Sequence, residues 1–359
     1  MLRYTVKRLL YGLLVLLGVV TLVFFLFNIL PGDPARMMLG QRADEESVAI
    51  INRDLGRDKP VALQYVNYLN DLLPLSLHVN DDPEHYFYLD PDKYSPCHQL
   101  VRMGHVSLVV KAPYLRRSYQ SKRKVSEIIS TAFPQTAVLA LTAMIFALVV
   151  GLILGVFSAL YKDSWFDRLA LFISTLGMSL PSFFAAILIA WFFAYILADV
   201  THLNMFGNLY TVDDYGSGEF IDIKNLILPA LTLGIRPLAT LITLTKNSML
   251  EALSQDYIRT ARAKGISWRR VVVRHALRNA LNPIVTSATG WLAGLLAGSV
   301  FVEYVFDWKG MGVVIVDGLD KYDFPVVMGS ILFICILLVF INILTDILYA
   351  IIDPRVRLN

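Results

Sequence analysis

Charged residues are scarce in this chain of 359 residues, because Asp, Glu, Lys and Arg together make up 17% of it. Soluble globular domains contain about a quarter. Cysteine is also scarce, with Cys97 and Cys335 only, and two cysteines so far apart give no disulfide framework. Hydrophobic residues make up 56%. This balance is typical of a membrane protein.

The sequence motifs of common catalytic sites are missing as well. The chain lacks G-x-x-x-x-G-K-[ST], the loop with which many proteins hold the phosphates of ATP. It also lacks G-x-S-x-G and H-E-x-x-H, which mark hydrolases and zinc proteases. The spacing of four histidines fits no known ligand pattern, and we expect them to be solvated surface residues: His78, His85, His98 and His105. We expect no catalytic, cofactor or metal site in this chain.

Long uncharged runs are what the sequence has instead. Five runs exceed the roughly 20 residues that cross a bilayer as a helix: Leu9–Leu30, Phe133–Tyr161, Leu169–Ala198, Asn279–Val302 and Phe324–Thr345. A sixth run, Leu226–Thr245, is interrupted by Arg236, which either lines a water-filled path or lies near a membrane interface. We predict an all-α membrane protein with six transmembrane helices.

Basic residues determine the expected orientation in the membrane. Arg3, Lys7 and Arg8 precede the first run, which places the N-terminus in the cytoplasm. That run is too long for the apolar segment of a cleaved signal peptide and should remain as a helix. Six spans return the C-terminus to the cytoplasm, and Lys and Arg are concentrated in the short loops of that side.

The apolar runs divide the chain into three parts. Residues 1–30 hold the first transmembrane helix, residues 31–132 form a large extracytoplasmic loop region, and residues 133–359 form a five-helix core. Within the loop region, Leu55–Leu69 predicts a short amphipathic helix introduced by a proline. A basic run before the second span suits a solvated face or a contact with anionic lipid, and no nucleic acid partner is expected.

Small residues and helix breakers mark two of the spans. Gly290, Gly294 and Gly298 recur every four residues in the fifth span, which predicts close helix packing on one face. Gly177 and Pro181 loosen the third span near its middle. A kink beside a transport path and the ordinary tolerance of proline in membrane helices both account for them.

The most informative segment is Glu251–Pro283, a polar and strongly basic stretch between two apolar runs. Its pattern predicts two short helices. Gly265 suits the C-terminal cap of the first and Ser267 the N-cap of the second, and Pro283 marks the beginning of the next span. So organised a helical hairpin between membrane spans indicates contact with a partner.

Two faces are predicted on the second helix of this hairpin. A basic stripe repeats every four residues: Arg270, Arg274 and Arg278. An apolar face lies beside it: Val272, Val273, Ala276, Leu277 and Ala280. The first helix offers Tyr257, Ile258 and Ala261 on one side. Either the hairpin docks a partner, or it is an amphipathic loop that lies on the inner leaflet.

The hairpin motifs DYIRTARAKG and RHALRNAL resemble the cytoplasmic loop of ABC-importer permeases of the dipeptide and oligopeptide group. The generic loop has an alanine four residues before a glycine, which Ala261 and Gly265 match. Arg259 and Thr260 stand where the generic loop has Glu and Ala, and HALR at His275–Arg278 replaces its I-x-L-P. These departures look like the peptide-permease version of the loop.

The resemblance extends over the rest of the chain. LPGDP at Leu30–Pro34 and LGRDKP at Leu55–Pro60 are similar to family motifs that follow the first span. Lys309 replaces the usual proline of a third motif, and Leu73–Tyr114 looks like an insertion without a counterpart in the family. The third motif, E-x-x-F…PGxG…DxP, is matched by Glu303, Phe306, Gly310, Gly312, Asp323 and Pro325.

The resemblance implies a type I ABC importer permease fold in the bacterial inner membrane. Such permeases pair with a second, homologous permease subunit and with two ATP-binding subunits, and they receive ligand from an extracytoplasmic substrate-binding protein. ATP and Mg then belong to the partner subunits, and this chain is not an enzyme. The loop at residues 250–282 would dock on the ATPase through the following residues: Asp256, Tyr257, Arg259, Ala261 and Gly265.

The expected function is half of the translocation path of an ATP-driven importer of short peptides, working by alternating access. Nickel, a nickel complex, glutathione or another small solute is the alternative within the family. A channel is a further alternative, although the chain lacks a selectivity-filter run such as TVGYG. A membrane-anchored sensor would use the large outer loop as its receptor. Membrane lipid is an expected partner in every case.

Overall fold

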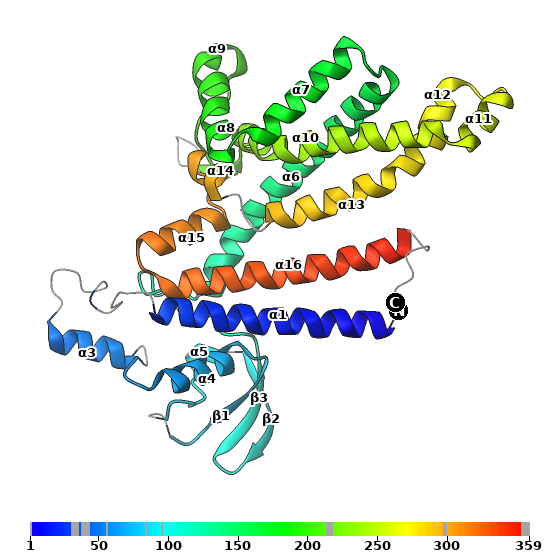
Figure 1. The fold of residues 1–359 in the computed structure, drawn as a ribbon. Helices are drawn as coiled ribbons and strands as arrows, with labels where there is room; N and C mark the ends of the chain where they lie inside the picture. Colours follow the sequence, from blue (N-terminus) through cyan, green and yellow to red (C-terminus); the bar gives the residue numbers. More distant parts are fainter. Residues whose placement is uncertain are drawn as a thin grey trace. The chain divides into compact units, whose positions relative to one another are not determined.

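The computed structural model describes residues 2–29, 36, 44–54, 57–82, 85–94, 96–212, 218–296 and 300–352 (Figure 1). Most of the described residues are helical. The chain divides into two compact units. The small unit comprises residues 12–131 and 314–335, and the large unit comprises residues 1–11, 132–313 and 336–359.

The small unit contains part of the first helix, a group of short elements and the start of the last helix. Its elements are α1 (Leu2–Ile29), α3 (Glu45–Asp54), α4 (Val61–Leu72), β1 (Leu75–Val79), α5 (Pro91–Tyr94), β2 (Cys97–Met103), β3 (Val106–Lys111) and α16 (Phe324–Ile352). Pro60 takes the N-cap position of α4, so the helix predicted over Leu55–Leu69 is present but begins at Val61 and ends at Leu72.

A three-stranded antiparallel sheet, in the order β1-β3-β2, follows α4. Leu75 lies opposite Val110, and the register of β2 shifts between Gln99 and Val101. The expectation of an all-α chain is therefore wrong here. The sheet falls inside the segment 73–114 that was predicted as an insertion, and the alternation in LSLHV and VSLVVK has the period of a strand rather than of a helix.

The core of the small unit forms where α4 and α16 pack on α1. Phe24 of α1 is 1% exposed, and its ring centroid lies 5.1 Å from that of Tyr65 and 5.5 Å from that of Tyr68 on α4. The hydroxyl groups of Thr21 and Tyr65 are 2.6 Å apart. Phe324 of α16 packs in the same cluster. Helix α4 thus packs against the apolar run of α1.

The large unit is built from α6 and the helices that follow it. Its elements are α6 (Val125–Leu160), α7 (Trp165–Ser179), α8 (Ser182–Ile189), the π-helix η2 (Ala190–Ile196), α9 (Ala198–Thr201), β4 (Tyr210–Val212), β5 (Glu219–Ile221), α10 (Lys224–Ser254), α11 (Asp256–Ala263), α12 (Trp268–Arg270), the π-helix η3 (Val271–Ala276), α13 (Leu277–Leu296) and α14 (Val300–Val305). Helix α15 (Met311–Asp320) begins in this unit, but most of it belongs to the small unit. Strands β4 and β5 pair as a short antiparallel ribbon, a second departure from the all-α expectation.

Among the described residues, four helices are long and apolar enough to cross a membrane: Lys7–Phe27, Val125–Leu160, Lys224–Ser254 and Phe324–Thr345. A fifth span results if α7 and the α8–η2 segment count as one, although they meet at 114°. The break falls at Leu180–Pro181, which favours a bend over the ordinary tolerance of proline as the explanation for Gly177 and Pro181. Proline disfavours the helical conformation of the residue before it, and Pro181 accordingly takes the N-cap position of α8.

Glycines allow close helix crossings in the large unit, but not at the positions expected from the sequence. A Cβ atom on Gly151 of α6 would lie 2.9 Å from the Cβ of Leu241 on α10, and one on Gly155 would lie 2.8 Å from the carbonyl oxygen of Ile242. In contrast, a Cβ on Gly290 or Gly294 of α13 would meet no atom within 4 Å. Gly298, the third member of that series, lies outside the described residues.

Candidate functional site

The hairpin between α10 and α13 begins with α11, whose end is closed by a glycine. Gly265 has φ +77°, a backbone conformation that favours glycine. Its N–H donates to the carbonyl of Arg262 at 2.9 Å, and the N–H of Ile266 donates to that of Ala261 at 3.3 Å. This pair of bonds is a Schellman motif. It confirms Gly265 as the C-terminal cap of the first hairpin helix.

The second hairpin helix starts at the predicted residue but ends elsewhere. Ser267 takes the N-cap position, and its carbonyl accepts from the N–H groups of Arg270 and Val271. From there α12, η3 and α13 follow one another without an intervening residue. Pro283 lies inside α13, so the prediction that it marks the beginning of a span is wrong. Proline removes its own N–H and crowds the carbonyl four residues earlier, and helices in membranes tolerate this because neighbouring groups satisfy the freed backbone.

A buried apolar cluster holds the hairpin against the helices that carry it. Met249 of α10 is 0% exposed, and Ala159 of α6 packs in the same cluster. The segment Glu251–Pro283 contributes seven buried side chains: Ala252, Ile258, Ala261, Val271, Val272, Ala276 and Ala280. Val273 was predicted on this face but is exposed, because in the π-helix η3 its side chain points to another side than those of Val271 and Val272.

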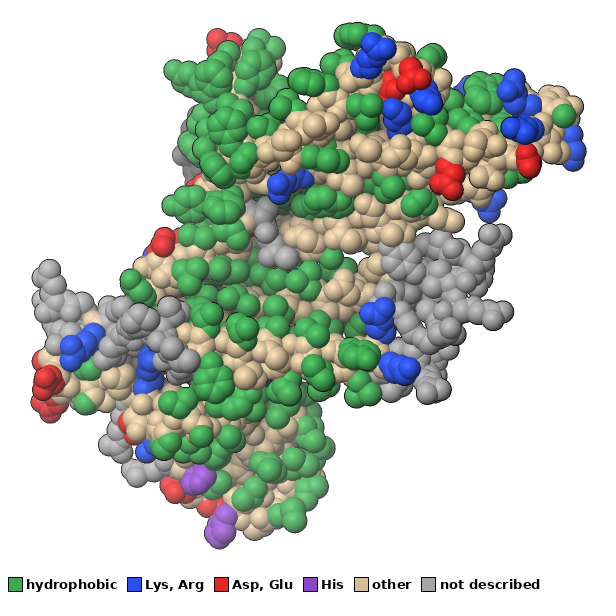
Figure 2. Space-filling view, in the orientation of Figure 1, with side chains coloured by type: hydrophobic (Ala, Val, Ile, Leu, Met, Phe, Trp, Pro, Cys, Tyr) green, Lys and Arg blue, Asp and Glu red, His purple; other side chains and the backbone are tan. Residues whose placement is uncertain are grey.

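Two of the five predicted docking residues are structural, and the other three are exposed. Ala261 is buried in the hairpin cluster and Gly265 closes the turn. Asp256, Tyr257 and Arg259 are exposed on α11, and Arg259 Nη1 lies 3.5 Å from Asp256 Oδ1. In Figure 1 the hairpin occupies the free end of α10, and Figure 2 shows basic side chains gathered there.

Two further residues contribute to the hairpin and were not picked out from the sequence. The guanidinium carbon of Arg262 lies 5.3 Å from the ring centroid of Trp268, a cation–π contact across the turn. The basic stripe predicted on the second helix is exposed along its length: Arg270, Arg274 and Arg278. The hairpin surface thus combines aromatic, acidic and basic side chains around a fixed turn.

An ion pair ties the three helices behind the hairpin together. Lys246 of α10 lies 2.7 Å from Asp167 Oδ1 of α7, with the two side chains 11% and 3% exposed. Ser158 of α6 donates its hydroxyl to the same carboxylate, and the N–H of Asp163 donates to it at 2.9 Å. The sequence patterns alone did not assign Lys246 a partner. A lysine within an otherwise apolar helical stretch was the available signal.

The third sequence motif encloses a buried carboxylate. Glu303 is 0% exposed and accepts hydrogen bonds from Thr136 Oγ1 at 2.9 Å and from the N–H of Gly312 at 2.7 Å. The N–H of Gly310 donates to the carbonyl of Trp308 at 2.6 Å, which makes Lys309 the centre of a three-residue turn. The turn therefore closes without the proline that is usual at this position.

The last two residues of that motif act within the small unit. Asp323 is 4% exposed, and its carboxylate accepts from Ser118 Oγ at 2.5 Å and from the N–H of Tyr119 at 2.8 Å. Its carbonyl accepts from the N–H groups of Val326 and Val327 at the start of α16. Asp323 thus joins the loop before α6 to the beginning of the last helix.

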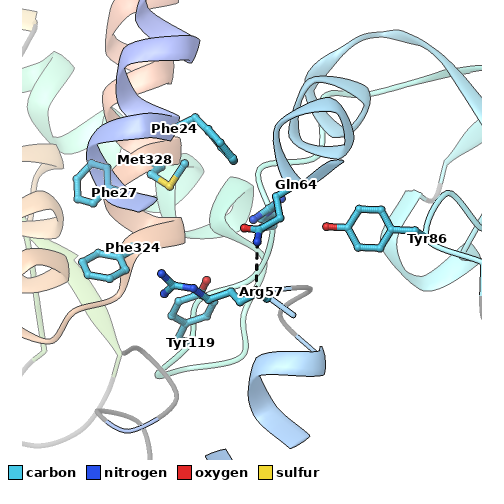
Figure 3. Close-up of a pocket in the computed structure, with 9 residues that line it drawn as sticks. Phe24, Phe27, Arg57, Gln64, Tyr86, Tyr119, Phe324 and Met328 are labelled. Atoms are coloured by element: carbon cyan, nitrogen blue, oxygen red, sulfur yellow. Dashed lines mark hydrogen bonds between the residues drawn. The ribbon is translucent and has the colours of Figure 1, made fainter. Parts of the chain in front are cut away.

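Figure 3 shows a small pocket in the same unit, between α1 and the loop elements. Its lining includes Phe24, Phe27 and Tyr119, and Gln64 Nε2 donates to the carbonyl of Arg57 at 3.3 Å beside it. The cavity volume of about 30 Å³ has room for one or two water molecules. A transported solute would not fit there.

Comparison with known families gives the identity of the chain. Residues 151–358 match the family described as binding-protein-dependent transport system inner membrane component, and residues 1–79 match the corresponding N-terminal family. The chain belongs to this family of ABC-importer permeases. Such a permease is a transport subunit rather than an enzyme, and ATP hydrolysis takes place on separate subunits. The family also implies a substrate-binding protein as a partner.

Relatives match this permease over nearly its whole length. The dipeptide transport system permease protein DppB of Alkalihalophilus pseudofirmus is 33% identical over 373 residues, covering 99% of this chain and 100% of the relative. The glutathione transport system permease protein GsiC of Salmonella typhimurium is 34% identical over 357 residues, covering 99% of each chain. The di/tripeptide transport system permease protein DppB of Pseudomonas aeruginosa is 34% identical over 373 residues, with the same coverage.

Among solved structures, the permease resembles a chain of the inward-facing MetNI methionine ABC transporter. The TM-score is 0.50 at 18% identity, and the match covers 64% of this chain and 97% of that chain. A second crystal form of the same transporter matches with a TM-score of 0.51 at 17% identity. At this identity the likeness concerns the fold alone, and it supports a permease-like arrangement of helices.

Proposed function

We propose that this permease forms half of the translocation path of an importer of short peptides and works by alternating access. The observation that carries the proposal is full-length similarity to dipeptide and di/tripeptide permeases. Glutathione, itself a tripeptide, is the second candidate because the glutathione permeases are equally similar. ATP with Mg would be bound by the partner subunits.

The hairpin is the proposed coupling element to an ATP-binding subunit. Its core is anchored to α6 and α10, so a force on the hairpin is transmitted to two long helices. Asp256, Tyr257 and Arg259 are exposed and would contact the partner. Ala261 and Gly265 would act by holding the turn in shape, because one is buried and the other adopts a positive φ.

The proposed topology has six spans, both termini in the cytoplasm, and residues 31–132 outside. In that arrangement the hairpin at residues 250–282 faces the cytoplasm, as coupling requires. A second, homologous permease would complete the path. The exposed face of α13 at Gly290 and Gly294, which no atom of the described chain approaches, suits close packing with a helix of that partner.

Co-purification tests the coupling role of the hairpin. The tagged permease would be purified in mild detergent from its host, with Arg259→Glu and Tyr257→Ala compared against Arg274→Glu, an exposed arginine on the second hairpin helix. We expect the first two variants to lose ATP-binding subunits and the third to keep them. Equal recovery in all variants would remove α11 from the interface. Equal loss in all three would show that the interface is not confined to α11 and extends to the second hairpin helix.

Uptake by cells tests the substrate. A strain lacking the gene would be complemented with the permease and supplied with radiolabelled dialanine or glutathione. We expect the permease to restore uptake of dialanine, and restoration of glutathione uptake alone would favour the second candidate. Restoration of neither would contradict a peptide importer. The same cells would show dependence on ATP, which a passive channel lacks.

Cysteine labelling tests the topology. In a Cys97→Ser/Cys335→Ser background, Glu46→Cys and Arg259→Cys would be treated in intact cells with a membrane-impermeant maleimide. We expect labelling at position 46 and none at position 259 until the membrane is opened. The reverse pattern would invert the orientation and place the hairpin outside, where it could not meet an ATPase.

A further inference from the structure

The sheet of the small unit has its polar side chains on the inside. Along β1 and β3 the residues facing the interior are Ser76, His78, Ser107, Val109 and Lys111, and each of them is at most 4% exposed. A sheet with one face in water normally shows the opposite alternation, apolar inward and polar outward. The inverted pattern suggests that the outward face of the sheet does not lie in water.

The polar interior is held by hydrogen bonds. Lys111 Nζ donates to the carbonyl of Asp71 at 2.6 Å, and the hydroxyl of Tyr94 donates to Asp71 Oδ1 at 2.7 Å. Ser76 Oγ lies 3.0 Å from His78 Nε2. Because buried polar groups of this kind need partners, the network fixes which face of the sheet points inward. The apolar residues are thereby left on the outside.

The outward side of the sheet is apolar, and we call it the apolar sheet face. Its exposed residues are Leu75, Leu77, Val101, Met103, Val106 and Val110. Met103 is 77% exposed and Leu77 is 58% exposed. Figure 2 shows hydrophobic side chains covering much of this domain. A face of this kind on a soluble domain would be an aggregation hazard along the edge strand β2.

A groove beside α4 extends the apolar surface. It has a volume of about 450 Å³ and is lined mainly by apolar side chains, among them Val66 and Leu73 of α4 and Leu77 and Val106 of the sheet. On β2, His98 lies opposite Val110 and therefore on this face, whereas Arg102 lies opposite Ser107 on the other face, with its guanidinium paired with Asp81 at 3.0 Å. The surface therefore offers apolar area rather than charge.

The contacts between α4 and α1 indicate that the small unit lies at the depth of the bilayer interface. Tyr65 contacts Thr21 and Phe25 of α1, about 6 to 12 Å before the helix ends at Ile29, given a rise of 1.5 Å per residue. The apolar run of α1 is about as long as the bilayer core is thick, so its end marks the membrane boundary. Interfacial elements bury their apolar faces about 5–10 Å deep, and α4 is seated at that depth.

Exposed apolar residues of α1 lie beside α4, which also indicates contact with lipid. Leu22, Phe25 and Leu26 are exposed on α1, where a membrane-spanning helix faces lipid, and the ring of Phe25 meets that of Tyr65 at 5.6 Å. In Figure 1 strands β2 and β3 lie on the side of α4 that is opposite to the C-terminal end of α1. The sheet is thus drawn alongside the membrane helix and not beyond its end.

We propose that the apolar sheet face lies in the lipid of the bilayer leaflet at the C-terminal end of α1. With the orientation under Proposed function, on which this assignment of side rests, that is the outer leaflet. The face recognises acyl chains through apolar area, without selecting the charge of the lipid headgroup. The segment after α1 is then a domain whose sheet contacts the membrane.

Quenching of a fluorophore by lipid-bound and by water-soluble quenchers tests whether the apolar sheet face contacts lipid. The permease, with the subunits that co-purify, would be placed in phosphatidylcholine nanodiscs in the Cys97→Ser/Cys335→Ser background. Leu77→Cys and Val101→Cys, both at exposed positions, would carry the environment-sensitive fluorophore NBD, with Glu46→Cys on the charged helix α3 as the water-facing control. Doxyl-labelled phosphatidylcholine reports contact with acyl chains, and iodide reports contact with water.

We expect doxyl lipid to quench positions 77 and 101 at least twofold more than position 46, and iodide to do the reverse. Iodide quenching of 77 and 101 equal to that of 46 would overturn the proposal. Protection from both quenchers would mean that a protein, such as the binding protein or another subunit, covers the face, and would overturn it too. Nanodiscs have no inside or outside, so these outcomes do not depend on the topology or the substrate.

Discussion

Lys246 of α10 donates to Asp167 Oδ2 of α7 at 2.9 Å, within a buried network that also includes Ser158 of α6. This pair connects α7 to α6 and α10, the two long helices against which the hairpin cluster packs. Removing one partner of a buried ion pair leaves an uncompensated charge, which costs about 3–5 kcal/mol. We therefore expect Lys246→Met to lower the thermal stability of the purified permease strongly.

Size-exclusion profiles after heating would measure this loss. The matched control is Lys162→Met, an exposed lysine between α6 and α7, which should leave the melting temperature unchanged. A double variant, Lys246→Met with Asp167→Leu, should regain part of the stability because no charge is left unpaired. Equal melting temperatures for Lys246→Met and the control would show that the pair contributes nothing.

Alanine substitutions at Gly312 and Gly290 test where a side chain would clash with its neighbours. A Cβ on Gly312 would lie 2.6 Å from the backbone Cα of Val300 and 2.8 Å from Glu303 Oε2, so Gly312→Ala should cost about 1–3 kcal/mol by overpacking. Gly290→Ala meets no atom within 4 Å and should leave the isolated chain as stable or slightly more so. Thermal unfolding in detergent measures both, and equal losses would contradict this packing.

The positive φ of Gly265 leads to an ordering of substitutions. A Cβ there would meet no neighbouring atom within 4 Å, so the cost comes from the backbone alone and should be about 1–2 kcal/mol for alanine. Asparagine tolerates this conformation better, and valine tolerates it worse because it is β-branched. Backbone amides of residues 256–266 should therefore exchange faster than in the unsubstituted protein. The increase should be smallest for Gly265→Asn, larger for Gly265→Ala and largest for Gly265→Val.

The neighbouring substitution Lys264→Ala is the control for this series, since Lys264 has no positive φ. It should leave exchange in the hairpin unchanged. If Gly265→Asn and Gly265→Val gave the same exchange rates, the turn would not depend on the left-handed conformation. Co-purification of ATP-binding subunits with each variant would then relate the shape of the turn to coupling.

His78 makes the sheet sensitive to acid. Burial, with a smaller contribution from the nearby Lys111, lowers the pKa of His78 below its usual value of 6.5. The unfolded state then binds a proton at a higher pH than the folded state does, so stability falls as the pH drops below about 6.5. Amides of residues 75–79 and 106–111 should exchange faster at pH 5.5 than at pH 7.5, after correction for intrinsic rates.

Substitution of His78 separates this effect from other titrations. His78→Gln should remove the difference between the two pH values, whereas His105→Gln should retain it because His105 is 86% exposed. A pH dependence that survived in His78→Gln would assign the sensitivity to another group. The measurement uses the full chain in nanodiscs, so the domain stays in its membrane setting.

Local patterns predicted several elements correctly. Pro60 began α4, Gly265 ended α11, and Ser267 began the next helix, because caps and prolines act within a few residues of the chain. Pro283 was misjudged because a proline inside a membrane helix is tolerated in some surroundings and not in others. The surroundings of a residue depend on helices distant in sequence, which local rules do not include.

The candidate site was only partly visible in the sequence. The resemblance drew attention to Ala261 and Gly265, yet their burial and backbone conformation came from the fold. Small residues recur at Gly290 and Gly294 and also at Gly151 and Gly155, but only the second pair lies at a helix crossing within this chain. Identical spacing cannot distinguish the two, because the difference lies in what packs against each face.

Composition, run length and caps determined that this chain is a mainly helical membrane protein with a polar hairpin between two apolar segments. These properties follow from free energies of transfer and from hydrogen bonds that act within one helix. Only the tertiary structure decided that Asp167 and Lys246 pair, that Glu303 is enclosed by Thr136 and Gly312, and that the sheet faces outward with its apolar side. Each of these depends on groups brought together from separate parts of the chain.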